Sequence, residues 1–270
     1  MTLIITELSE FGIVMAGDSA ITLSGVTPIK AFGDRAFFGL KKVIPVYKIN
    51  AGIAYWGWTK MPPHCDEVPW FDEWLESYLF LNQHKYSSIH ELAALLESEL
   101  QNKVNPMTDA ELELLPLGNG GLHLAGYTEY QGKAQPCLYH IHNGRSDTHP
   151  ESDSHIVNAN FDIPPNKFLE NIGRGNPYLR NGDIEVFARF FDGYFQQFLQ
   201  EVRRDMQITL PIIALRDDFW RSQIKFISSL YELAGEFTDR GLPRRMVRSI
   251  GGDVTTLMIH ANMLGRYETR

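Results

Sequence analysis

Three residues near the start of the chain, Thr2, Asp18 and Lys42, have side chains that together could activate a nucleophile. A threonine behind a removable initiator methionine carries a hydroxyl and a free α-amine, so one residue can supply both the nucleophile and its base. The pKa of an α-amine, about 7.7–8.0, suits proton uptake near neutral pH. A nearby ammonium would lower the pKa of the hydroxyl, and a buried carboxylate would hold that ammonium in place. We therefore expect removal of Met1 and a catalytic centre at Thr2.

The elements that must position these residues are strands. Apolar runs predict two β-hairpins in the first sixty residues, one over 2–20 and one over 43–58. Apolar residues then recur at helical spacing in two segments, 70–79 and 89–100, which predicts a pair of one-sided helices.

The second half of the chain repeats this pattern of strands followed by helices. We predict strands over 121–130 and 134–144, a long polar loop over 143–165, helices over 187–202 and 220–234, and a last strand over 253–261. This order is typical of an αββα sandwich, an α+β fold in which helices cover two antiparallel sheets. We predict a single domain over 1–270, with the loop near 143–165 as an insertion.

Composition narrows the class of protein. The chain has 270 residues, of which 44% are hydrophobic and 21% charged, as in a globular protein with a sizeable core. Its net charge of −8 argues against nucleic acid as a partner. The apolar runs are too short to span a membrane and the start of the chain has no signal-like pattern, so we expect a cytoplasmic protein. Two cysteines, Cys65 and Cys137, cannot build a disulfide framework or a cysteine zinc site.

The beginning of the chain also resembles a known family. The start of the chain resembles the catalytic subunits of proteasome β-subunit-type threonine peptidases, within the N-terminal-nucleophile hydrolases and including the bacterial proteasome-like proteins. The resemblance lies in Thr2, the segment GIVMAGDSAIT, the pair Lys41-Lys42 and the strand GIAYWGWT. The resemblance implies that Thr2 is the nucleophile, Asp18 its buried partner and Lys42 the activating cation. It gives the backbone N–H of Gly57 as the oxyanion donor, with Trp56 as the alternative register. It also implies a peptide or protein substrate, homo-oligomeric rings and no cofactor, and it leaves a regulatory ATPase unknown.

Two later segments depart from the family pattern. Arg174, within 172–178, stands where the family has a supporting serine, and it could bind a substrate carboxylate. Before the glycine pair at 251–252, Ile250 takes a serine position and Val247 an aspartate position, although Ser249 could substitute after a shift of one residue. These departures leave two alternatives open: a small-molecule amidohydrolase of the same superfamily, and a non-catalytic assembly subunit.

Two further clusters carry weaker signals. His140 and His142 lie on one face of a predicted strand and could chelate a metal, but the sequence places no third ligand beside them, so we predict no metal site. Four arginines near the glycine pair form a surface cluster or, with Arg174, select acidic substrates. They are Arg240, Arg244, Arg245 and Arg248.

Overall fold

The structure is a computed structural model of the whole chain. The residues it describes are 3–9, 12–19, 39–58, 70–105, 120–145, 155–171, 177–182, 221, 253–261 and 263–269.

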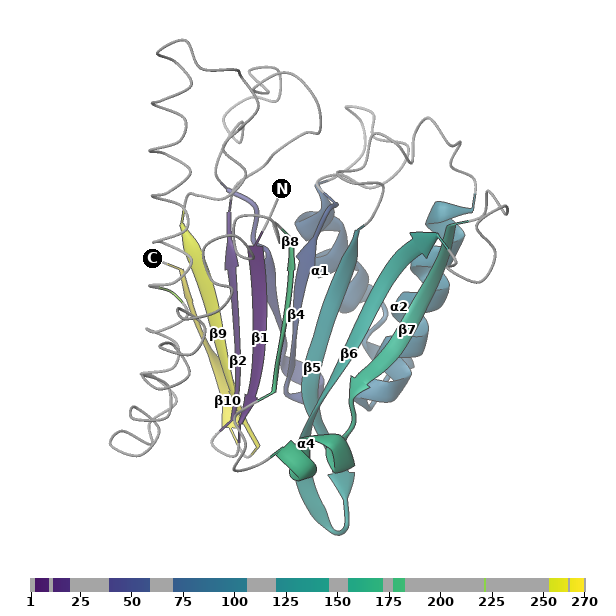
Figure 1. The fold of residues 1–270 in the computed structure, drawn as a ribbon. Coiled ribbons are helices and arrows are strands. Elements are labelled where there is room, and N and C mark those ends of the chain that lie inside the picture. Colours follow the sequence, from purple (N-terminus) through teal and green to yellow (C-terminus); the bar gives the residue numbers. More distant parts are fainter. Residues whose placement is uncertain are drawn as a thin grey trace.

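Two antiparallel five-stranded sheets face each other (Figure 1). The first has the strand order β10-β9-β2-β1-β8 and combines strands from distant parts of the sequence. Its strands are β1 (Leu3–Ser9), β2 (Gly12–Asp18), β8 (Tyr178–Gly182), β9 (Val254–His260) and β10 (Met263–Thr269).

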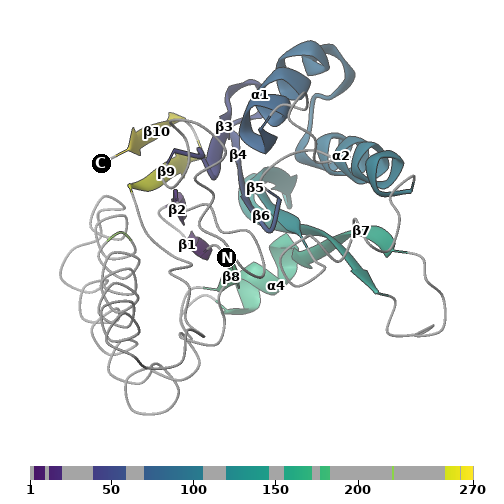
Figure 2. The same cartoon turned by 90° about the horizontal axis from the view of Figure 1, so that it is seen from above.

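The second sheet follows the chain order β3-β4-β5-β6-β7, so each strand pairs with the next one along the sequence. Its strands are β3 (Val43–Val46), β4 (Ala51–Trp56), β5 (Gly121–Tyr130), β6 (Lys133–Arg145) and β7 (His155–Ile163). Viewed from above, α1 (Phe71–Leu81) and α2 (Ile89–Val104) cover the face of this sheet that points away from the first sheet (Figure 2). The short helix α4 (Pro165–Asn171) follows β7.

Alternation along the strands divides the apolar residues between two cores. One core lies between the second sheet and its helices and includes Tyr55, Phe71 and Leu92. The other lies between the two sheets, where Ile4 and Leu8 of β1 contact residues of the second sheet. The predicted α+β fold of two antiparallel sheets with helices is therefore confirmed.

The sequence predictions hold for some segments and fail for others. The hairpins and the helices α1 and α2 lie where they were expected. The prediction of a loop over 143–165 is wrong in large part, because β6 continues to Arg145 and β7 occupies His155–Ile163. The strands β8 and β10 were not predicted. The helices predicted over 187–202 and 220–234 lie outside the described residues apart from Arg221.

Candidate active site

Asp18, the last residue of β2, joins the start of β1 to the beginning of the second sheet. One of its carboxylate oxygens, Oδ1, accepts hydrogen bonds from the backbone N–H of Leu3, at 3.0 Å, and from Nζ of Lys42, at 2.9 Å. Asp18 and Lys42 are 1% and 2% exposed, so this ion pair is buried. In the sequence, this N–H of Leu3 directly follows Thr2.

The local fold explains why these groups meet. In the β1–β2 hairpin Ile4 pairs with Gly17, which brings Leu3 opposite Asp18. Gly17 lets the second sheet come close, because a Cβ there would lie 3.3 Å from Cβ of Lys42. Lys42 directly precedes β3, and its carbonyl accepts a hydrogen bond from the N–H of Tyr55 in β4, at 3.0 Å.

Burial changes the proton affinity of Lys42. Desolvation lowers the pKa of its ammonium below the ordinary 10.5, and the charge and hydrogen bond of Asp18 oppose this effect without cancelling it. Lys42 therefore releases its proton at a lower pH than an exposed lysine does.

Gly57 lies directly after β4, where the chain leaves the second sheet. Its φ of 80° falls in the left-handed region that favours glycine. The ring of the preceding Trp56 packs across Gly121 of β5, where a Cβ would lie 2.2 Å from the indole. The position of Gly57, the predicted oxyanion donor, thus depends on the end of β4 and on the packing of Trp56 against Gly121.

The structure brings together only part of the predicted site. Asp18 and Lys42 meet beside the N–H of Leu3. Thr2 lies outside the described residues, as do four later residues of the sequence-based site analysis, Arg174, Val247, Ser249 and Ile250. Their predicted roles stay predictions.

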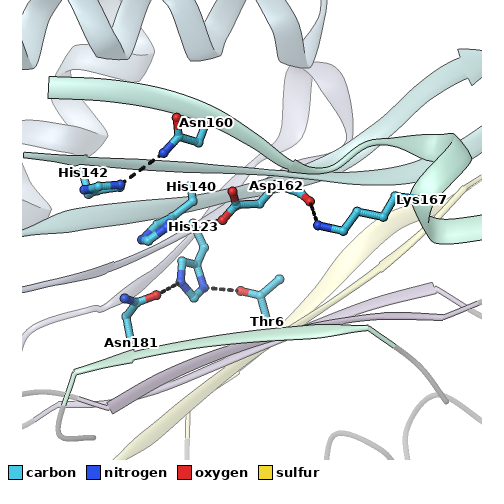
Figure 3. Close-up of polar contacts among 8 residues, drawn as sticks. All are labelled: Thr6, His123, His140, His142, Asn160, Asp162, Lys167 and Asn181. Carbon is cyan, nitrogen blue, oxygen red and sulfur yellow. Dashed lines mark hydrogen bonds and ion pairs between the residues drawn. The ribbon is translucent and has the colours of Figure 1, made fainter. Parts of the chain in front are cut away.

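A polar layer that was not predicted from the sequence lies between the two sheets (Figure 3). His123 of β5 is fully buried, and its ring lies between the hydroxyl of Thr6 in β1 and the amide of Asn181 in β8. Burial lowers the pKa of His123 to about 3, so the ring is neutral at physiological pH.

Two more histidines continue this layer along β6. The rings of His140 and His142 lie 4.5 Å apart between centroids, which agrees with their predicted shared face. Asp162 of β7 lies 3.4 Å from Nδ1 of His140, and His140, with its neighbours, holds the pKa of that carboxyl below its usual value. Nε2 of His140 is buried and has no hydrogen-bond partner among the described residues.

The described residues contain no group of three or more His, Cys, Asp or Glu side chains placed to hold a metal ion. Within the same part of the chain, no helix combines the length and apolar character needed to cross a bilayer.

No protein-family model and no curated protein sequence matches the chain. Among solved structures, it is similar to Anbu (ancestral beta-subunit) from Yersinia bercovieri, with 14% identity and a TM-score of 0.48, over 99% of this chain and 87% of that one. It is also similar to an Anbu (Gly-1) mutant from Hyphomicrobium sp. strain MC1, with 13% identity and a TM-score of 0.41, over 100% of this chain and 87% of that one.

These findings correct the family expected from the sequence. The solved structures are described as Anbu proteins, a proteasome-like family distinct from the proteasome β-subunit-type threonine peptidases, so the expected membership of the latter is wrong. Likenesses at this level of identity and TM-score carry no argument about the reaction.

Proposed function

We propose that the chain is an amide hydrolase of the N-terminal-nucleophile type, in which Thr2, freed by removal of Met1, attacks the carbonyl carbon of a peptide or related amide. One observation carries the proposal. The buried carboxylate of Asp18 accepts hydrogen bonds both from the Lys42 ammonium and from the N–H that follows Thr2. A buried ion pair is costly to desolvate, and its position beside a residue with a hydroxyl and an α-amine gives it a chemical use.

The proposed reaction has two steps. In the first, the Thr2 hydroxyl oxygen bonds to the carbonyl carbon while the α-amine takes the hydroxyl proton. The carbon–nitrogen bond of the amide then breaks, and the proton passes from the α-amine to the departing amine, which leaves an ester on Thr2. In the second step, water attacks this ester, releases a carboxylic acid and restores the hydroxyl.

Lys42 and Gly57 have separate roles in this scheme. The Lys42 ammonium stabilises negative charge that develops at the hydroxyl oxygen, and Asp18 fixes its position. The backbone N–H of Gly57 donates to the oxygen of the tetrahedral intermediate. Assembly into a ring and the identity of the substrate are further parts of the proposal, for which the described residues offer no specific contact.

Labelling by a peptide epoxyketone, followed by intact mass, tests the proposal. We expect the purified protein to have the mass of residues 2–270 and to gain one inhibitor. Thr2→Ala should abolish the adduct, because it removes the hydroxyl, whereas Thr2→Ser should retain it. An adduct on Thr2→Ala as abundant as on the wild type, or full retention of Met1 in active protein, would overturn the assignment of Thr2.

Two neighbouring lysines provide a matched control. Lys42→Met removes the buried ammonium, so we expect the labelling rate to fall about a hundredfold or more. It also leaves the Asp18 carboxylate without its charge partner, at a cost of about 3–5 kcal/mol in the free energy of unfolding, so folding is checked by circular dichroism. Lys41→Met removes an exposed lysine whose Nζ bonds Glu76 at 3.1 Å, and it should label like the wild type.

A further inference from the structure

The reaction geometry proposed above crosses from one sheet to the other. Residue 2 precedes β1 of the first sheet, whereas Lys42 precedes β3 and Gly57 follows β4 of the second. The alignment of nucleophile, ammonium and oxyanion donor therefore depends on contacts that fix β1 relative to the second sheet.

His123 makes such a contact from the centre of the second sheet. Its Nδ1 lies 2.9 Å from Oγ1 of Thr6 in β1, and its Nε2 lies 2.7 Å from Oδ1 of Asn181 in β8. Since Asn181 presents its amide oxygen, Nε2–H donates to it, and Nδ1 accepts the hydroxyl hydrogen of Thr6. A single neutral ring thus holds two adjacent strands of the first sheet.

The strand β8 pairs with β1 from the first residue of β1 onward. Asn181 pairs with Ile4 and Gly182 with Leu3, so β8 flanks the residues that follow Thr2. Thr6 is three residues from Leu3, a span of roughly 10 Å along an extended strand. A shift of Thr6 would therefore be passed along a paired strand to residue 2.

The ring of His123 is itself held in one orientation. It packs edge-on against His140, with 5.5 Å between ring centroids. The Trp56 ring contacts it at a tilted angle, with 5.7 Å between centroids. His140 is oriented in turn by Asp162. Figure 3 shows the His123 ring between Thr6 and Asn181, with His140 next to it.

We propose that His123 is a positioning residue, which acts through Thr6 and Asn181 to fix the start of β1 relative to Lys42 and Gly57. This inference rests on the proposed function in so far as Thr2 is the nucleophile. A histidine that merely fills the core would stabilise the whole molecule without acting selectively on the start of β1.

The chain offers a matched control for this distinction. Tyr127, also in β5, donates its hydroxyl to the carbonyl of Ile259 at 3.1 Å and so makes another hydrogen bond between the sheets. This bond holds β9, not β1. Tyr127→Phe removes one inter-sheet hydrogen bond, as Thr6→Val does, but leaves the contact with β1 intact.

The test compares four variants by two measurements. The first is the rate of epoxyketone labelling, separated into the maximal rate and the inhibitor concentration at half that rate. Thr6→Val and His123→Phe should lower the maximal rate about tenfold or more, because the nucleophile is displaced from its attack geometry, with little change in the half-saturating concentration. Thr6→Ser keeps the hydroxyl and should restore the rate, and Tyr127→Phe should stay close to the wild type.

The second measurement is hydrogen exchange over 3–9, which does not require activity. Exchange there should speed up in Thr6→Val and His123→Phe but not in Tyr127→Phe. If the wild type is not labelled at all, the proposed function is overturned, while this exchange pattern would still support positioning of β1. Equal effects of Tyr127→Phe and Thr6→Val on both measurements, or wild-type behaviour of Thr6→Val, would overturn the inference. If His123→Phe does not fold, the comparison of Thr6→Val with Thr6→Ser tests the inference.

Discussion

At the scale of residues, the two titratable groups of the proposed site should give opposite limbs of a pH profile. The α-amine of Thr2 must be neutral, so labelling should rise with an apparent pKa of about 7.7–8.0. Lys42 must be charged, so labelling should fall again where Lys42 loses its proton. Because burial lowers the pKa of Lys42, this fall should begin below the ordinary value of 10.5.

The measurement is the second-order rate constant of epoxyketone labelling between pH 6 and the onset of alkaline unfolding. Lys41→Met, which alters an exposed lysine, should give a superimposable curve. A rate that keeps rising beyond the pH at which Lys42 loses its proton would contradict the cationic role and make neutral Lys42 the base.

The residues that could be found from the sequence are those whose chemistry is local to the chain start. Asp18 and Lys42 stood out because their types complement a threonine nucleophile, and the structure does bring them together. His123 gave no such signal. Its partners Thr6 and Asn181 are 117 and 58 residues away in sequence, and only the packing of the two sheets makes them neighbours.

At the scale of elements, β7 and β8 escaped prediction for a shared physical reason. Both contribute polar side chains to the contacts around His123 and His140, Asp162 from β7 and Asn181 from β8. On these strands polar residues stand between apolar ones such as Ile163 and Leu179, so the apolar alternation is short and the segments resemble loops. α2 supports β7 at its edge, since the N–H of Val157 donates to Gln101 at 2.7 Å.

The junction of β4 and β5 leads to a second prediction. A methyl group at Gly121 would lie 2.2 Å from the Trp56 ring and 2.6 Å from the carbonyl oxygen of Ile141. Gly121→Ala should therefore displace Trp56, and Gly57 with it. We expect a loss of about 1–3 kcal/mol in the free energy of unfolding, measured in urea, together with slower labelling.

Gly52→Ala is the control, because it crowds the opposite end of β4. There the new methyl group would meet Cδ2 of Leu257 and Sδ of Met15, which lie near the far ends of flexible side chains and not on the backbone. This variant should label at the wild-type rate even if it loses some stability. Equal loss of labelling in the Gly52 and Gly121 variants would show that the packing of Trp56 against Gly121 does not specifically position Gly57.

At the scale of the whole molecule, the buried histidine should make the fold sensitive to acid. The unfolded chain takes up a proton on His123 near pH 6.5, whereas the folded chain resists protonation until about pH 3. Stability should therefore fall as the pH drops below 6.5, with a contribution from this group of about 2 kcal/mol between pH 7 and pH 5.

Urea unfolding at pH 7, 6 and 5 measures this loss. His123→Gln, which has no group that titrates in this range, should lose less stability than the wild type over the same interval by about that amount. Comparing the two proteins cancels the contributions of other groups, such as Asp162. Identical pH slopes would show that His123 is not the source of the acid sensitivity.

The strand order of the two sheets also has a consequence for how the chain acquires its structure. The second sheet pairs successive strands within residues 43–163 and can form from local contacts as they emerge. The first sheet must wait, because β1 gains β8 only after residue 182 and β2 gains β9 only after residue 260. The start of β1 thus precedes in the sequence the strands that later flank its sheet partners, and it is fixed only after they have been made. A chain built in this order cannot complete the sheet around the start of β1 before the residues of β9 have left the ribosome.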